Sequence, residues 1–295
     1  MTLSLVADIG GTSTRLALAR QGRVVTGSAR RIDNDAVESI EAAVVAFLTE
    51  MGESPERACL AAAGPVKDGS VRLTNRDWTV SFGSVQAATG IADITLMNDL
   101  QAMGHALAVP EIAGGPLTRT RMVLAIGTGM NAAVAHPIGD GRAFVPAGES
   151  GYCALPFTAA EDAALLQALA SDFGAPVAEA ALTGSGLERL HRLMTGDVAP
   201  AATGTAGDGP VRRMALHILG RYLSSLALTH LPYDGIYLAG SVGRALFPAM
   251  ESPAFTESYL DAGAYRPLLE GFPLRLIEAD DAPLHGLARL MDDRP

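Results

Sequence analysis

Short apolar runs alternate along the chain with stretches in which apolar residues recur every three or four positions. The first pattern predicts buried strands, and the second predicts helices with one buried face. Strands and helices in alternation are typical of an α/β fold. Strands are expected over residues 3–7, 58–63, 71–74, 94–97, 123–126, 235–239 and 274–277.

Polar residues and prolines mark where several helices begin. The pairs Asp35 with Glu38, Thr158 with Glu161 and Ser185 with Glu188 have the spacing of a capping box. Pro210 is expected to open the longest helix and Pro283 the last one, because proline is favoured in a first helical turn. Residues 197–209 are rich in glycine, alanine and proline, and we expect a loop there.

The chain length and an internal repeat both indicate two domains. A chain of 295 residues is long for a single core. The N-terminal strand leads into the turn Gly10-Gly11-Thr12, and the strand over 123–126 leads into the similar turn Gly127-Thr128-Gly129. A second strand is expected after each turn. This repetition predicts two related halves that face each other across a cleft.

Composition and charge restrict the partners. Hydrophobic residues make up 48% of the chain and charged residues 18%, and the formal net charge is −10. An acidic chain is a poor ligand for the phosphate backbone, so nucleic acid is not an expected partner. We expect neither a membrane span nor a secretory signal, because no apolar run is long enough and Asp8 follows a start without basic residues. A cytoplasmic protein is therefore predicted.

Few residues are available to bind phosphates or metals. Lys67 is the only lysine, and no P-loop string occurs. The phosphates of a nucleotide would therefore be held by backbone N–H groups, arginine and a divalent metal ion. Cys59 and Cys153 are far apart and lack the spacing of a metal cluster or a disulfide framework.

The first glycine turn has the features of an anion cradle. Gly10, Gly11 and Thr12 offer backbone N–H groups and a hydroxyl at the tip of a hairpin. Asp8 ends the preceding strand, where it could hold a hydrated metal ion. Paired glycines are also common in simple hairpin turns, so the turn alone leaves both interpretations open.

Asn98 and Asp99 lie where a predicted strand meets a predicted helix. The strand covers Ile94–Met97, and Leu100, Met103 and Leu107 give the helical spacing. Ligands bind at the carboxyl ends of strands in α/β proteins, so both side chains could meet a substrate. Asp99 could equally be the N-cap of the helix, and this stretch alone favours the cap.

Three further places could carry chemistry. The loop 146–152 presents Glu149 and Tyr152 among glycines, and Glu179 precedes another glycine-rich turn. Gly240 and Ser241 follow the strand over 235–239. Small residues at such a turn permit either a flat ligand such as adenine or close packing of the backbone.

Seven motifs in order resemble those of the bacterial glucokinase family, in the actin-like sugar kinase superfamily. They cover essentially the whole chain and read DIGGT, TNRDW, MNDLQA, IGTG, PAGESG, LTGSGL and YLAGSVG. The resemblance implies an α/β fold of two ribonuclease-H-like domains that flank a central cleft. A small domain is expected over 1–108, joined by the terminal helix of about 283–295, and a large domain over 109–282.

The resemblance also implies an activity and its residues. The chain is expected to transfer a phosphoryl group from ATP to the primary hydroxyl of a hexose, with glucose as the first candidate and Asp99 as the base. Further implied roles are sugar binding by Asn98, Asp99, Glu149 and Glu179, nucleotide binding by Asp8, Gly10, Gly11, Thr12, Gly127, Thr128, Gly129, Gly240 and Ser241, and a Mg²⁺ ion on Asp8 through water. We add Asn75 and Tyr152 as sugar ligands. A homodimer is expected, since it is the commonest assembly.

Two positions depart from the family pattern. Tyr152 stands where family members commonly have histidine, and Ser241 stands where glycine is usual. The tyrosine could alter sugar selection, because a phenol is longer than an imidazole and stays uncharged at neutral pH. The alternatives are therefore a kinase for another hexose or an aminosugar, and a sugar-binding regulator without turnover.

Overall fold

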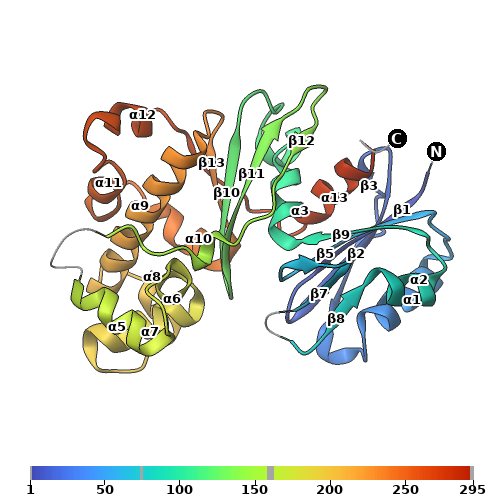
Figure 1. The fold of residues 1–295 in the computed structure, drawn as a ribbon, viewed down its shortest axis with the longest axis horizontal. Coiled ribbons are helices and arrows are strands. Elements are labelled where there is room, and N and C mark those ends of the chain that lie inside the picture. Colours follow the sequence, from blue (N-terminus) through green and yellow to red (C-terminus); the bar gives the residue numbers. More distant parts are fainter. Residues whose placement is uncertain (1, 74–75, 158–162, 293–295) are drawn as a thin grey trace. The chain divides into compact units, whose positions relative to one another are not determined.

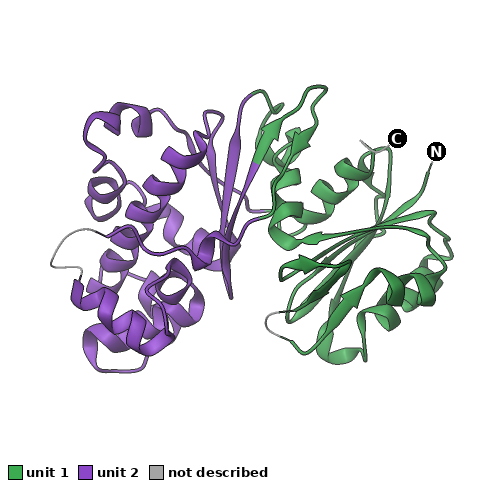
Figure 2. Ribbon diagram, viewed as in Figure 1, with its two compact units in different colours: residues 1–118, 135–147, 279–295 green, residues 119–134, 148–278 purple. Residues whose placement is uncertain are grey.

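The computed structural model describes residues 2–73, 76–157 and 163–292. Asn75 and the pair Thr158 with Glu161 lie outside these ranges. Internal contacts divide the chain into two compact units, of which unit 1 comprises residues 1–118, 135–147 and 279–295, and unit 2 comprises 119–134 and 148–278 (Figure 2).

Unit 1 is built on a six-stranded sheet with the order β3-β2-β1-β5-β9, in which β4 also pairs with β2 (Figure 1). The first two long strands form an antiparallel hairpin, whereas β5 and β9 run parallel to β1. The strands of this sheet are β1 Ser4–Ile9, β2 Ser13–Arg20, β3 Arg23–Val24, β4 Arg30–Asp33, β5 Arg57–Ala62 and β9 Asp93–Asn98. A second, three-stranded sheet contains β6 Val66–Lys67, β7 Ser70–Arg72 and β8 Thr79–Ser81.

Helices cover both faces of the six-stranded sheet. Side chains from α1 (Ile40–Met51) and α2 (Phe82–Thr89) pack with one set of strand residues. The other set, which includes Val6 and Cys59, packs against α3 (Asp99–Ala106) and α13 (Ala282–Asp292). The two helices approach closely, since a side chain on Gly286 of α13 would overlap the Ala102 carbonyl oxygen of α3. The short helix α4 spans Pro110–Ala113.

Unit 2 contains most of a five-stranded sheet with the order β12-β11-β10-β13-β14. The central pair β10 and β13 and the next pair β13 and β14 are parallel. The strands are β10 Arg121–Ile126, β11 Met130–Pro137, β12 Ala143–Phe144, β13 Ile236–Ala239 and β14 Leu274–Leu276. Residues 135–147, which contain β12 and the end of β11, belong to unit 1.

The long helix α9 (Pro210–His230) provides much of the core of unit 2, with Ile218, Tyr222 and Leu226 buried. It begins at the expected proline. The remaining helices are α5 Ala163–Phe173, α6 Ala178–Leu182, α7 Gly184–Thr195, α8 Ala201–Thr205, α10 Gly240–Leu246, α11 Pro253–Tyr259 and α12 Arg266–Glu270.

Three helix starts differ from the expected ones. Asp35 lies in a 3₁₀ turn, Asn34–Ala36, and the N-cap of α1 is Ser39, whose hydroxyl accepts the Ala42 N–H. The N-cap of α7 is Thr183 and not Ser185. The N-cap of α3 is Asn98 and not Asp99. In addition, the segment expected to be a loop over 197–209 contains α8.

Candidate active site

The β1–β2 hairpin carries Asp8 opposite Arg15. The Arg15 guanidinium donates to the Asp8 carboxylate at 3.1 Å, and the side chain of Asp8 is only 11% exposed. Burial raises the pKa of Asp8, and the charge and hydrogen bond of Arg15 oppose that effect. Gly10 and Gly11 are half-buried at the hairpin tip and Thr12 is exposed.

Asn34 holds this tip in shape from another part of the chain. It is fully buried, its side-chain amide donates to the carbonyl oxygens of Gly10 at 2.8 Å and Gly11 at 3.2 Å, and its side-chain oxygen accepts from the Thr14 hydroxyl at 2.8 Å. With both carbonyl oxygens turned to Asn34, the turn is fixed by the fold before any ligand arrives. Sequence reasoning missed Asn34, whose one visible signal is an amide within the polar run that follows β4.

Asn98 is buried and organises the junction between β9 and α3. Its side-chain oxygen accepts the Leu100 N–H at 2.9 Å, and its side-chain amide donates to the Gly64 carbonyl at 3.1 Å. The Gln101 side chain completes the capping box by accepting the Asn98 N–H. Asp99 is therefore the first residue of the helix, half-buried, with one carboxylate oxygen on the Leu100 N–H at 2.9 Å.

The hairpin tip and this junction lie at the same edge of the sheet. Ile9 pairs with Ala62, and Ala62 pairs with Asn98, so the three strands end in register. Two strand spacings separate the outer pair, roughly 10 Å. The structure of unit 1 thus brings together the expected phosphate turn and the expected sugar residues Asn98 and Asp99.

The carboxylate of Asp8 fits a magnesium ion that is contacted through water. Among the described residues, no group of three or more His, Cys, Asp or Glu side chains could hold a metal. Mg²⁺ keeps several waters and commonly takes one or two carboxylates together with substrate phosphates. Asp8, one of whose oxygens is bonded to Arg15, fits contact through water.

In unit 2, the turn Gly127–Gly129 lies beside Gly240 and Ser241. A Cβ on Gly127 would lie 3.8 Å from the Ser241 hydroxyl oxygen, in ordinary contact, and the Gly184 N–H at the start of α7 donates to the Gly127 carbonyl. Gly240 has φ +79°, and a side chain there would overlap the Ile126 carbonyl oxygen. Position 240 therefore requires glycine, because the backbone of β10 leaves no room for a side chain. Thr128 and Ser241 are exposed.

Glu149, Tyr152 and Glu179 form a cluster in unit 2. Tyr152 is 59% exposed, and its hydroxyl lies within reach of a hydrogen bond to Glu179. Burial raises the pKa of Glu149, and the Glu179 charge raises it further. Burial, the Glu179 charge and that hydrogen bond likewise raise the pKa of Tyr152. Glu179 thus lies close enough to Glu149 and Tyr152 to raise the pKa of both.

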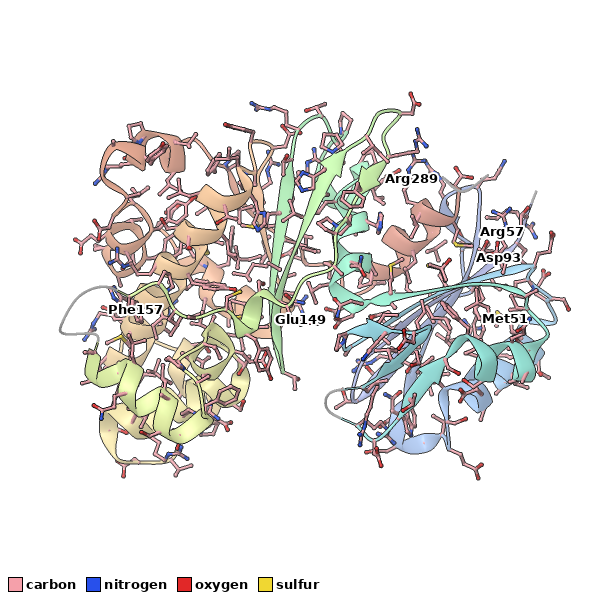
Figure 3. All side chains as sticks on the ribbon, viewed as in Figure 1. Met51, Arg57, Asp93, Glu149, Phe157 and Arg289 are labelled. Carbon is pink, nitrogen blue, oxygen red and sulfur yellow. The ribbon has the colours of Figure 1, made fainter. Side chains whose placement is uncertain are left out.

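The backbone around this cluster leaves no room for a side chain at Gly151. Gly151 lies between Glu149 and Tyr152, and a Cβ on it would overlap the Met130 carbonyl oxygen. The Met130 N–H in turn donates to the Glu179 carboxylate at 3.1 Å. Glu149 follows Gly148 on the loop that leads into this turn (Figure 3).

Asn131 is a second residue that sequence reasoning missed. It is buried, and its side-chain amide donates to the Gly148 carbonyl at 2.7 Å and to the Glu149 carboxylate at 3.2 Å. Its side-chain oxygen accepts the N–H and the hydroxyl of Ser150. Tyr222 of α9 donates to the Ser150 carbonyl, and burial raises its pKa to about 12. The Glu149 loop is therefore held by Asn131 on one side and Tyr222 on the other.

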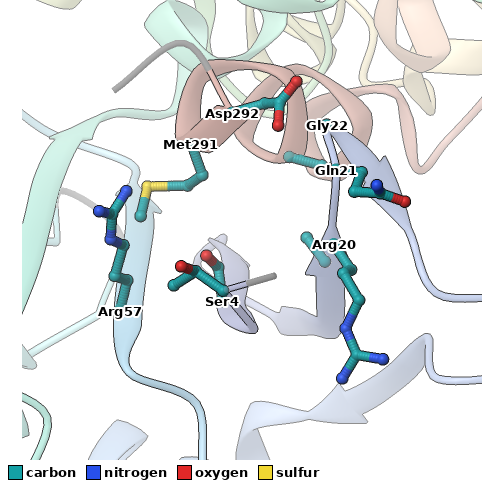
Figure 4. A pocket seen from close by; sticks show the side chains of 10 residues that line it. Ser4, Arg20, Gln21, Gly22, Arg57, Met291 and Asp292 are labelled. Atoms are coloured by element: carbon teal, nitrogen blue, oxygen red, sulfur yellow. The ribbon is translucent and has the colours of Figure 1, made fainter. Parts of the chain in front are cut away.

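A cavity of about 300 Å³ in unit 1 lies apart from these residues (Figure 4). Ser4 and Arg57, the first residues of β1 and β5, line it and pair in register, so it is at the opposite end of the strands from Asp8. None of the expected site residues within the described ranges lines it. Its other lining residues are Thr2, Ala19, Arg20, Gln21, Gly22, Ala288, Met291 and Asp292.

Comparisons with known proteins agree over nearly the full length. A family model described as Glucokinase matches residues 5–294. The glucokinase of Salmonella typhi is 28% identical over 304 residues, which covers 96% of this chain and 95% of that protein. The crystal structure of a glucokinase from an Antarctic psychrotroph has a TM-score of 0.77, is 25% identical and covers 100% of both chains. A ROK family glucokinase from Streptomyces griseus, solved with glucose and AMPPNP, shares the fold with a TM-score of 0.64, 20% identity and 98% coverage of both chains.

The mixed α/β fold and these matches define the chain as a sugar phosphotransferase. It belongs to the glucokinase family. The resemblance found in the seven sequence motifs is thereby confirmed, as is the expected α/β class. No helix in the described ranges has the length and apolar character needed to cross a membrane.

Proposed function

We propose that the chain is an ATP-dependent hexose kinase that converts D-glucose and ATP to glucose 6-phosphate and ADP, with Asp99 as the catalytic base. The observation that carries this proposal is that Asn98, and not Asp99, caps the helix at the junction between β9 and α3. Asn98 supplies the helix cap, so the carboxylate of Asp99 is not needed as the N-cap and lies at the strand edge where α/β proteins bind ligands.

The chemistry assigned to Asp99 is general base catalysis. Its carboxylate accepts the proton of the sugar's primary hydroxyl while that oxygen attacks the γ-phosphorus in line, and the bond to the ADP oxygen breaks. The N-terminus of α3 favours a negative charge at Asp99 before the sugar binds. Asn98 orients the sugar beside the base, and its own orientation is fixed by Gly64 and Leu100.

In unit 2, we assign Glu149, Tyr152 and Glu179 to the sugar hydroxyls. Each hydroxyl can donate and accept, and two carboxylates with one phenol offer both kinds of partner. Fixing a sugar in one orientation contributes several kcal/mol to lowering a barrier of this kind. Asn75 stays a proposed sugar ligand outside the described residues.

The nucleotide is assigned to the backbone turns. Gly10, Gly11 and Thr12 in unit 1, and Gly127, Thr128 and Gly129 in unit 2, hold its phosphates, and Gly240 with Ser241 lies by its adenosine. Asp8 would hold Mg²⁺ through water. When bound, the ion supplies positive charge that offsets the charge on the phosphoryl oxygens.

We further propose that both units are ribonuclease-H-like domains of the actin-like superfamily. The antiparallel hairpin followed by parallel strands in unit 1 supports this assignment. Boundaries at 1–108 with the terminal helix of about 283–295, and 109–282, stay a prediction. The compact units differ from them by placing 109–118, 135–147 and 279–282 in unit 1. We propose a cytoplasmic homodimer, because ATP is supplied in that compartment and two-fold dimers are the commonest assembly.

A second candidate is a kinase for an aminosugar. Glu149 and Glu179 lie close enough for one charge to raise the pKa of the other, and a phenol stands beside them where an imidazole could have offset the charge. A sugar with an ammonium group would relieve this repulsion between the carboxylates.

The test is ADP release with ATP and Mg²⁺, measured with glucose, mannose, fructose and glucosamine, for the wild type and Asp99→Asn. We expect the highest kcat/KM with glucose, and a loss of about a thousandfold or more in kcat for Asp99→Asn with sugar binding retained. Near-normal kcat in Asp99→Asn would overturn the base assignment. Highest kcat/KM with glucosamine would select the second candidate.

A further inference from the structure

Arg189 of α7 contacts three groups around the proposed sugar residues of unit 2. Its Nε donates to the Asp172 carboxylate at 2.6 Å, and one Nη donates to the Ala180 carbonyl at 2.8 Å. Its guanidinium carbon lies 4.8 Å from the centre of the Phe173 ring. The arginine side chain is only 15% exposed, so solvent screens these contacts weakly.

Two of these three contacts, those with Phe173 and Ala180, connect Arg189 to a proposed sugar ligand. Phe173 ends α5 and packs against Tyr152, with 6.4 Å between ring centres, within the range of a favourable aromatic pair. Ala180 follows Glu179 directly on α6. One guanidinium is thus linked to both Tyr152 and Glu179, which lie close enough to interact.

An exposed tyrosine normally loses rotamer freedom when a ligand binds. Next to Tyr152, Gly151 fixes the backbone against Met130. The ring of Tyr152 packs against the ring of Phe173. Phe173 is in turn held by Arg189, which Asp172 orients. A side chain ordered in advance costs less conformational entropy on binding.

We propose that Arg189 is a positioning residue for sugar recognition: through Phe173 it holds the Tyr152 ring so that the tyrosine hydroxyl meets the sugar in a fixed position relative to Glu179. This inference rests on the proposed function, because it assumes that Tyr152 and Glu179 bind the sugar. Arg189 acts on binding and not on the transferred phosphoryl group, so its loss raises KM for the sugar and leaves kcat in place.

Arginine is suited to this role and lysine is not. A planar guanidinium stacks on a ring while its edge donates to a carboxylate and a carbonyl, whereas an ammonium on a flexible stem cannot make the three contacts together. Arg192 provides a matched control, because it lies on the same helix and donates to the other oxygen of Asp172 at 2.5 Å, with an exposed side chain. Of these two arginines, Arg189 is the one whose guanidinium lies over the Phe173 ring.

The experiment measures kcat, KM for glucose and KM for ATP in Arg189→Lys, Phe173→Leu, Phe173→Tyr and Arg192→Lys, with thermal unfolding of each variant. We expect Arg189→Lys and Phe173→Leu to raise KM for glucose by about fivefold to tenfold, with kcat and KM for ATP changed by less than about twofold. Phe173→Tyr keeps an aromatic face and is expected to keep the wild-type KM, as is Arg192→Lys.

A double-mutant cycle with Tyr152→Phe separates positioning from general stability. In that background the hydroxyl is absent, so Arg189→Lys is expected to change KM for glucose by less than about twofold. An equal effect in both backgrounds, or an unchanged KM in both Arg189→Lys and Phe173→Leu, would overturn the inference. If Arg189→Lys does not fold, the cycle with Phe173→Leu decides. Absence of turnover in the wild type with every sugar would instead overturn the proposed function.

Discussion

The side-chain amide of Asn34 donates to the carbonyl oxygen of Gly10 at 2.8 Å, although 24 positions separate the two residues in sequence. Together with the bond to Gly11, it holds the tip of the hairpin to which we assign nucleotide phosphates. The geometry of this turn is therefore set by a residue outside it.

Asn34→Asp tests this relationship, because aspartate keeps the acceptor for Thr14 but loses the donors to Gly10 and Gly11. We expect the Kd for ATP to rise about tenfold or more, since two buried hydrogen bonds are lost and a charge is added. Calorimetric titration with ATP and Mg²⁺ measures it. Thr14→Val is the control, because it removes only the hydroxyl that donates to Asn34. An ATP affinity lowered as much in Thr14→Val as in Asn34→Asp would contradict a specific role for the donors.

Gly151→Ala should disrupt the proposed sugar site. The added Cβ overlaps the Met130 carbonyl oxygen, so the turn that carries Tyr152 must shift away from Met130. We expect KM for glucose to rise by about a hundredfold or the protein to lose about 3 kcal/mol or more of stability. Gly148→Ala is the matched control, since a Cβ there meets nothing within 4 Å. Similar kinetics and unfolding temperatures in the two variants would argue against the tight turn.

Glu179→Gln should lower the pKa of Glu149. Burial and the Glu179 charge both raise that pKa above its ordinary value of 4.5, and the substitution removes the second cause. Carboxyl ¹³C resonances of glutamate-labelled protein, assigned with Glu149→Gln, follow the titration. Glu188→Gln on α7 is a control that should leave the Glu149 midpoint in place. An unmoved midpoint in Glu179→Gln would show that the two carboxylates do not interact.

His105 makes the stability of unit 1 sensitive to acid. Burial lowers the pKa of this α3 histidine from 6.5 to about 4, so the unfolded chain takes up the proton first as the pH falls. Stability is then complete above pH 6.5 and is lost progressively down to about pH 4, by about 3 kcal/mol in total.

Denaturant unfolding between pH 7.5 and 4 measures this effect, with His105→Gln compared with the wild type. The difference in unfolding free energy between the two should shift in favour of the variant as the pH falls. His136→Gln, in the same unit, serves as the control for removal of a histidine. A constant difference between His105→Gln and the wild type across the range would exclude the assigned cause.

Local patterns predicted the strands, the hairpins and the long helix because burial of an apolar face imposes their periodicity. They also placed Asn98 and Asp99 at the junction of a strand and a helix. They could not decide which residue is the cap, since both are good caps and the deciding contact, Asn98 to Gly64, spans 34 positions. The predicted start of α1 at Asp35 was wrong for a similar reason, because Asp35 instead forms an ion pair with Arg76 at 2.7 Å.

For the candidate site as well, the sequence predicted some residues and missed others. Motifs identified the groups assigned to sugar and nucleotide, whereas Asn34, Asn131 and Arg189 were missed. These three support other residues through hydrogen bonds, and the sequence around them does not show which segments they meet in the fold. A single chain shows which residue types are present, but the partners of a buried amide depend on segments that meet only in the folded state.

The close approach of Gly286 to Ala102 has a consequence for how the protein is made. The face of the sheet formed by Val6 and Cys59 is covered by α13, which the ribosome synthesises after the whole of unit 2. Until that helix emerges, the growing chain holds an exposed apolar face beneath the strand that carries Asp8. The half of the molecule that is translated first is thus completed last.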